Sequence, residues 1–203
     1  ENCPSDEAHE LFKLPDFVNK MVENKWFGSK TGQGFYKKVD KDILTLDLNT
    51  LEYRAAKRTS FATLELTKTI EKPINRFKVL VKGKDKAGEF YRKSFSGLFA
   101  YVSNRIPEIS DELYKIDDAM KAGFGWENGP FEIWDAIGVE NGIEIMKAEG
   151  LQPATWVTDM IASGNKNFYT IKEGATFFYN IATKSQLKVP GQDAFIILNN
   201  IRE

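Results

Sequence analysis

The side chains that most often carry enzyme chemistry are scarce in this sequence. His9 is the only histidine and Cys3 the only cysteine. His9 stands in a polar stretch, so we expect it to be solvated, and Cys3 has no neighbouring cation that would activate its thiol. The sequence therefore excludes a disulfide within the chain, a Cys/His zinc site, and any histidine-based chemistry beyond His9 itself.

Carboxylates are the remaining candidates for a general acid and a general base. Five of them fall in one stretch of the second half of the chain: Asp117, Asp118, Glu127, Glu132 and Asp135. Glu132 and Asp135 are three residues apart and would share one face of a helix, but so do many solvated pairs. The spacing favours surface or capping roles over catalysis.

Two glycine-rich segments are similar in composition to nucleotide-binding loops, but their glycines do not have the spacing that such loops need. Residues 28–34 read Gly-Ser-Lys-Thr-Gly-Gln-Gly, whereas a P-loop needs Gly-Lys-Ser/Thr after four intervening residues and then a helix. Residues 123–129 have the third glycine of a dinucleotide fingerprint displaced by one position, and a helical pattern precedes them. We therefore interpret Gly28, Gly32 and Gly34 as a structural turn, with Gly32 or Gly34 at positive φ.

Apolar periodicity predicts the elements that must position these residues. Helical spacing predicts a long core helix over 85–109, which Pro107 should end or kink. Further helices are predicted over 6–27, from Thr59 or Ser60, from Pro73, and over 116–122, 130–137, 140–149 and 155–163, the last four closed by Gly123, Gly138, Gly150 and Gly164. Residues 34–54 read as a hairpin or three-stranded ribbon and 167–189 as a second hairpin. No low-complexity linker divides the chain, so we expect one compact unit.

Aromatic residues fall into two groups. Phe90, Tyr91, Phe95 and Phe99 have helical spacing, which favours core packing over an acyl-chain or base-stacking surface.

A second group, Phe124, Trp126, Phe131 and Trp134, surrounds the glycine-rich corner at 123–129. We expect these side chains to pack against the long helix. If they are exposed instead, they mark a surface that meets another domain or subunit.

The balance of charge limits the classes of partner. The 28 basic and 29 acidic residues nearly cancel, so no long-range positive field exists to attract nucleic acid or an anionic membrane. No apolar run approaches the ~20 residues that cross a bilayer. The bland composition fits a reducing cytoplasm, and the missing initiator Met is expected of an excised or processed piece.

Two regions of the sequence contain motifs that are typical of one enzyme family. Residues 26–38, Trp-Phe-Gly-Ser-Lys-Thr-Gly-Gln-Gly-Phe-Tyr-Lys-Lys, resemble the G-x-K-x-G-x-G-F-Y segment that closes the first C-terminal helical domain of 3-hydroxyacyl-CoA dehydrogenases. Residues 104–109, 116–126 and 129–138 resemble the second copy of that domain, in the subgroup that fuses the dehydrogenase to an enoyl-CoA hydratase. The resemblance extends from about residue 15 to 165.

The resemblance implies a mainly α fold of 6-phosphogluconate-dehydrogenase-C-terminal-like helical repeats with two small β-hairpins. Residues 1–58 would be the tail of the first repeat with a β-ribbon, and 59–165 the second repeat. Residues 166–203 would be a hairpin tail or a linker toward a missing domain.

The family oxidises 3-hydroxyacyl-CoA with NAD in fatty-acid β-oxidation. Its NAD-binding Rossmann domain and catalytic His–Glu pair have no counterpart here, so we expect no catalytic, cofactor-binding or metal-binding residue in this chain. It would supply substrate-cleft and dimer contacts and be inactive alone. The implied partners are the missing Rossmann domain, a hydratase domain of the same chain, the acyl-CoA substrate and a second copy of the chain.

Asn104 begins the Asn-Arg pair of the second repeat, at the place where the first repeat of the family has a substrate-contacting Asn. Together with Trp126, Phe131 and Trp134 it is a candidate substrate-cleft or interface position. The alternative function is a helical protein-interaction module that kept the fold and lost catalysis.

Overall fold

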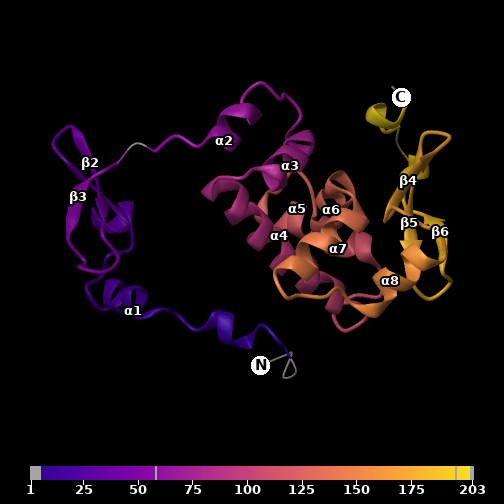
Figure 1. Cartoon of the computed structure of the whole chain (residues 1–203), viewed down its shortest axis with the longest axis horizontal. Coiled ribbons are helices and arrows are strands. Elements are labelled where there is room, and N and C mark those ends of the chain that lie inside the picture. The colour runs from indigo at the N-terminus through magenta and orange to yellow at the C-terminus, as the bar shows by residue number, and fades with distance from the viewer. Residues whose placement is uncertain (1–5, 58, 195, 202–203) are drawn as a thin grey trace. The chain divides into compact units, whose positions relative to one another are not determined.

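The computed structural model describes residues 6–57, 59–194 and 196–201 (Figure 1). Its contacts divide the chain into two compact units, unit 1 (Glu1–Thr59) and unit 2 (Ser60–Glu203). The expectation of one compact unit was wrong, because each unit makes its contacts mainly within itself. Cys3 lies outside the described residues.

Unit 1 combines short helices with a three-stranded sheet. In chain order it contains η1 (His9–Phe12), α1 (Asp16–Glu23), η2 (Ser29–Thr31), β1 (Tyr36–Val39), β2 (Asp42–Leu46) and β3 (Tyr53–Ala55). The strands are antiparallel in the order β1-β2-β3, with Tyr36 opposite Thr45 and Leu44 opposite Ala55. The predicted three-stranded ribbon is confirmed.

The single helix predicted over 6–27 was too long at both ends. Pro15 has φ −65° and ψ 153° and stands just before α1, which ends at Glu23. Proline disfavours helical backbone in the residue before it, so a helix could begin after Pro15 but not continue through it.

Unit 2 begins with seven helices. They are α2 (Ala62–Thr67), α3 (Pro73–Lys82), α4 (Lys86–Asn104), α5 (Leu113–Phe124), α6 (Pro130–Ile137), α7 (Val139–Ala148) and α8 (Thr155–Ala162). The predicted long helix corresponds to α4, which ends three residues before Pro107. The helix α5 continues past Gly123, and Gly125, at φ 68°, closes it instead.

Asp85 caps two helices at once. Its side chain accepts hydrogen bonds from Gly88 N at 3.0 Å in the first turn of α4 and from Thr63 N at 3.0 Å in the first turn of α2. A carboxylate in this position satisfies amides that have no partner within their own helix. The helix predicted from Thr59 or Ser60 therefore begins at Ala62, and its cap is Asp85, 22 positions after Thr63.

The core of unit 2 forms where α4 meets α6 and α7. Phe99 on α4 stacks on Trp134 of α6 with ring centroids 4.7 Å apart, and Phe168 meets the edge of Trp134 at 5.0 Å. All three side chains are buried. Phe90 is 63% exposed, so the core assignment was wrong for this residue, which lies in the first turns of α4.

A second antiparallel sheet follows the helices. It contains β4 (Tyr169–Lys172), β5 (Ala175–Asn180) and β6 (Ser185–Lys188) in the order β4-β5-β6, with η3 (Gln192–Ala194) and η4 (Leu198–Asn200) after it. The predicted hairpin thus gains a third strand. Phe178 and Tyr179 of β5 belong to the same buried cluster as the helices, so the mainly α fold includes this sheet in unit 2.

Among the helices of the described residues, none combines the length and apolar character needed to span a bilayer.

Candidate functional site

Asp117 is the most unusual polar residue of unit 2, because its carboxylate is completely buried. It lies on α5 and accepts hydrogen bonds from Phe131 N at 2.9 Å and Glu132 N at 3.1 Å, both in the first turn of α6. The hydroxyl of Tyr169 donates a third bond at 2.8 Å. Asp117 therefore caps α6 from a different helix and also holds the first residue of β4.

Glu132 completes the start of α6 from within the helix. Its Oε2 accepts from Gly129 N at 2.8 Å, and its Oε1 accepts from Lys121 Nζ on α5 at 2.8 Å. A side chain on Gly129 would collide with Asp117. The glycine is needed here for close approach. Of the two roles predicted for Glu132, surface or capping, the structure shows capping.

Asp135 connects α6 to the second sheet. Its two carboxylate oxygens accept hydrogen bonds from Phe168 N and Tyr169 N, each at 2.8 Å. It caps the entry to β4 rather than a helix. The residues Asp117, Lys121, Glu132, Asp135 and Tyr169 thus join three elements, and we call them the carboxylate brace.

Burial changes the proton affinity of the brace. Removal from water raises the pKa of Asp117 to about 7, although its hydrogen bonds act in the opposite direction. The pKa of Asp135 is also raised to about 7, for the same reason. Burial and the nearby Asp117 charge raise the pKa of Tyr169.

The carboxylate oxygens of the brace already accept hydrogen bonds from backbone amides, Tyr169 or Lys121. Its arrangement is that of a structural connection, in which buried polar groups satisfy one another.

The glycine-rich segment of unit 1 forms a tight turn. Gly28 has φ 93° and Gly32 has φ 78°. A Cβ on Gly34 would lie 2.8 Å from the Cα of Gly28, and Thr31 Oγ1 accepts from Phe27 N at 2.9 Å. The prediction of positive φ at Gly32 or Gly34 is confirmed, because left-handed backbone suits glycine and Gly34 must pass close to Gly28.

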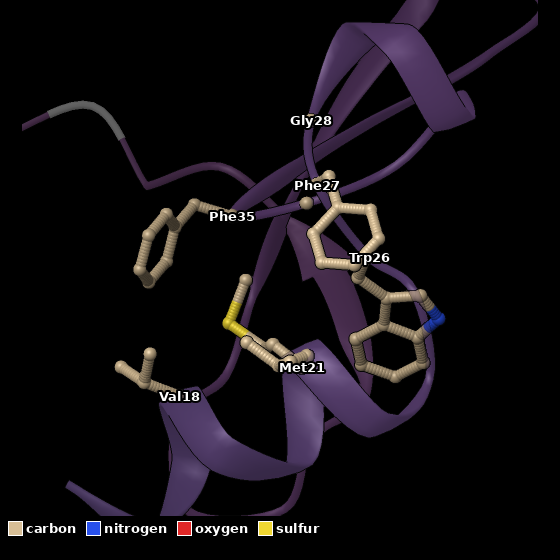
Figure 2. Close-up of a pocket in the computed structure, with 8 residues that line it drawn as sticks. Val18, Met21, Trp26, Phe27, Gly28 and Phe35 are labelled. Atoms are coloured by element: carbon tan, nitrogen blue, oxygen red, sulfur yellow. The ribbon is translucent and has the colours of Figure 1, made fainter. Parts of the chain in front are cut away.

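An apolar pocket lies beside this turn (Figure 2). Its volume is about 260 Å³, and it is lined by Val18, Met21, Val22, Trp26, Phe27, Gly28, Gly34 and Phe35. In Figure 2, Val18 and Met21 of α1 form one side, and Phe27 and Phe35 form the other. The lining is almost wholly apolar, so the pocket offers apolar contact but few groups that could orient a small polar ligand.

The four predicted cleft or interface positions fall into two groups. Asn104 is exposed at the end of α4, and Trp126 is 37% exposed on the corner between α5 and α6. Phe131 and Trp134 are fully buried, so the packing predicted for them is confirmed and their candidacy as cleft or interface positions is corrected: their rings fill the core under α4. Phe124 is 75% exposed, so the packing predicted for it against the long helix was wrong.

Neither glycine-rich segment fits NAD. A dinucleotide loop lies between a strand and the N-terminus of a helix, where amides face the pyrophosphate. Here Gly28–Gly34 connect α1 to β1, and the segment at 123–129 connects α5 to α6. No group of three or more potential ligands for a metal ion occurs among the residues that the structure describes.

Comparison with known proteins identifies the second unit. Residues 108–174 match the family model described as 3-hydroxyacyl-CoA dehydrogenase, C-terminal domain. Over 171 residues the chain is 40% identical to a probable 3-hydroxyacyl-CoA dehydrogenase of Bacillus subtilis. The chain contains a 3-hydroxyacyl-CoA dehydrogenase C-terminal domain.

More distant relatives carry a broader description. The chain is 24% identical over 206 residues to a putative fatty acid oxidation complex trifunctional enzyme of Rickettsia felis. The alignments cover 84% of this chain but 22% of the Bacillus protein, and 98% of this chain but 26% of the Rickettsia protein. The chain thus spans about a quarter of the length of these relatives. No solved structure matches it significantly.

The carboxylate brace lies entirely within the matched part of this dehydrogenase C-terminal domain. Sequence reasoning considered Asp117, Glu132 and Asp135 but did not connect them with Lys121 or Tyr169. One signal was present: a helix starting with Gly-Pro lacks a Ser, Thr, Asp or Asn cap of its own, so its amides need an acceptor from elsewhere.

Proposed function

We propose that this chain is the non-catalytic part of a longer 3-hydroxyacyl-CoA dehydrogenase, which oxidises 3-hydroxyacyl-CoA to 3-oxoacyl-CoA with NAD. In that protein it would complete the substrate cleft and supply dimer contacts. The observation that carries the proposal is the 40% identity over 84% of this chain to a protein of which it covers 22%. The chemistry then belongs to the remainder of the longer chain.

The chain's own groups are consistent with a supporting role. The buried carboxylates of unit 2 are engaged in the brace, and His9 lies in the short η1 helix with an exposed side chain. NAD and the catalytic pair would be provided by a Rossmann domain outside these residues. The trifunctional description of the Rickettsia relatives supports further domains in the same polypeptide.

The exposed residues of the α5–α6 corner are our candidates for the cleft or the dimer contact. Phe124 and Trp126 stand on either side of Gly125, whose left-handed backbone turns the chain after α5. Large apolar side chains in such a position favour an interface with another domain or subunit. Asn104 is the corresponding polar candidate.

The test begins with the coding sequence on both sides of these residues. The longest reading frame is expressed beside the 203-residue chain, and NADH formation from 3-hydroxybutyryl-CoA and a long-chain 3-hydroxyacyl-CoA is followed by absorbance. We expect turnover by the longer protein alone. Turnover by the purified 203-residue chain, or none by a folded longer protein, would refute the proposal, and the latter would favour the interaction module.

A further inference from the structure

Unit 1 buries too little to be complete by itself. Among its described residues only Met21, Gly34 and Leu46 are buried. Large apolar side chains are instead exposed along its length, namely Leu11, Phe12, Leu14, Val22, Phe27, Phe35, Tyr36, Val39, Ile43 and Leu48. Burial of apolar area is the main stabilising term for a small domain, so this surface calls for a covering element.

The exposed apolar surface has a defined centre. Val18, Met21 and Val22 recur at spacings of three and four on α1, and they form one wall of the apolar pocket. Phe27 and Phe35 form the facing wall (Figure 2). We call the pocket and these walls the α1 groove. Of the residues on its rim, Val22 is 50% exposed.

The form of the groove indicates what covers it. A helical apolar stripe beside an aromatic wall is the geometry in which an amphipathic helix lays its own apolar face. The near absence of polar groups in the lining argues against a small polar ligand, which needs groups that fix its orientation. The groove therefore fits another piece of folded polypeptide.

The lengths of the relatives indicate where that polypeptide comes from. The aligned region is 22% of the Bacillus protein and 26% of the Rickettsia felis protein, so most of each relative lies outside it. We infer that the α1 groove is covered by an amphipathic helix from the remainder of the longer polypeptide, with an apolar side chain in the pocket. This inference rests on the proposed function, from which the longer chain comes.

The test compares hydrogen exchange in the 203-residue chain and in the longest reading frame that contains it. Amides of residues 16–36 should exchange at least tenfold more slowly in the longer protein, because the covering helix hinders their opening. In the longer protein, Val22→Asp should return this exchange to the rate seen in the 203-residue chain. Phe27→Ala tests the facing wall without adding a charge and should act in the same direction.

A matched control comes from unit 2. Leu66 on α2 is 66% exposed, so Leu66→Asp also places a charge on an exposed apolar helix position. It should leave exchange of residues 16–36 unchanged in the longer protein. In the 203-residue chain, circular dichroism should show that Val22→Asp, Phe27→Ala and Leu66→Asp keep the parent fold.

Several outcomes would overturn the inference. One is equal exchange of residues 16–36 in the two proteins, and another is the absence of a longer reading frame. A third is a dimer of the 203-residue chain, seen by sedimentation, that Val22→Asp dissociates, since a second copy would then be the occupant. A fourth is protection of these amides by lauroyl-CoA alone.

Activity separates this inference from the proposed function. If the longer protein protects the groove but forms no NADH, the proposed function is refuted and the groove assignment stands. If it forms NADH but leaves the groove unprotected, the groove assignment is refuted and the proposed function stands.

Discussion

Phe131→Ala should remove one of the central rings of unit 2. Phe131 is fully buried, and its ring lies 5.0 Å from Phe168, 6.1 Å from Trp156 and 6.4 Å from Trp134, measured between centroids. Burying a phenylalanine contributes about 1.5–3 kcal/mol. The cavity that remains and the lost aromatic pairs bring the expected loss to about 3–5 kcal/mol.

Phe124→Ala is the matched control, because it is the same substitution seven residues earlier. The Phe124 side chain is 75% exposed. Its removal should change the free energy of unfolding by no more than about 0.5 kcal/mol. The pair therefore measures burial, with the chemistry of the substitution held constant.

Urea unfolding, followed by tryptophan fluorescence and circular dichroism, would give the free energy of unfolding of both variants, and thermal unfolding would give their Tm. For a unit of this size, Phe131→Ala should lower Tm by roughly 10 °C, while Phe124→Ala should leave it nearly unchanged. Equal losses for the two variants would refute the placement of the α5–α6 corner. A loss below about 1 kcal/mol for Phe131→Ala would mean that the ring is not in a packed core.

Three further predictions concern other parts of the chain. A side chain on Gly142 would collide with the Trp134 indole, whereas a side chain on Gly97 of α4 would meet open space. In chemical denaturation, Gly142→Ala should therefore lower the free energy of unfolding by about 1–3 kcal/mol and Gly97→Ala should raise it by about 0.5–1 kcal/mol. The opposite order would contradict the α6–α7 packing. Gly32→Val should cost about 1 kcal/mol or more because φ is 78° at this position, and an unchanged protection of unit 1 amides would argue against that turn. The pKa of Asp117 is about 7 in the folded protein against 3.8 for an ordinary aspartate, so the folded state holds the proton more tightly. The free energy of unfolding should therefore fall as the pH rises from 4 to above 7, and it should fall less in Asp117→Asn. An identical pH profile of stability for the two proteins would refute the shift.

The sequence predicted the bounds of a helix correctly where a proline marks its start and a single glycine marks its end. The helix α6 runs from Pro130 to Ile137 as predicted, because proline suits a first helical position and Gly138, at φ 97°, ends it. The end of α5 was misplaced because two glycines, Gly123 and Gly125, compete as its terminator. Only the tertiary structure decides between them, and Phe124 consequently faces solvent.

The brace could not be predicted in the same way. Asp117 meets Phe131 N and the Tyr169 hydroxyl across 14 and 52 positions of sequence. No local pattern specifies such pairing, since an isolated carboxylate on a helix is usually solvated. The aromatic residues of the α5–α6 corner show a related limit. All four were expected to pack against the long helix, yet Phe131 and Trp134 are buried while Phe124 is 75% exposed, because aromatic residues next to glycines occur both at corners and in cores.

The link between Tyr169 and Asp117 has a consequence for how unit 2 is completed during synthesis. The buried carboxylate receives its hydroxyl donor from residue 169, which is made 52 positions after it. Until that strand leaves the ribosome, the Asp117 carboxylate that caps the first turn of α6 lacks its hydrogen bond from Tyr169. We therefore expect the seven helices and the second sheet to acquire their protection together, late in elongation, with the last strands acting as the closing step.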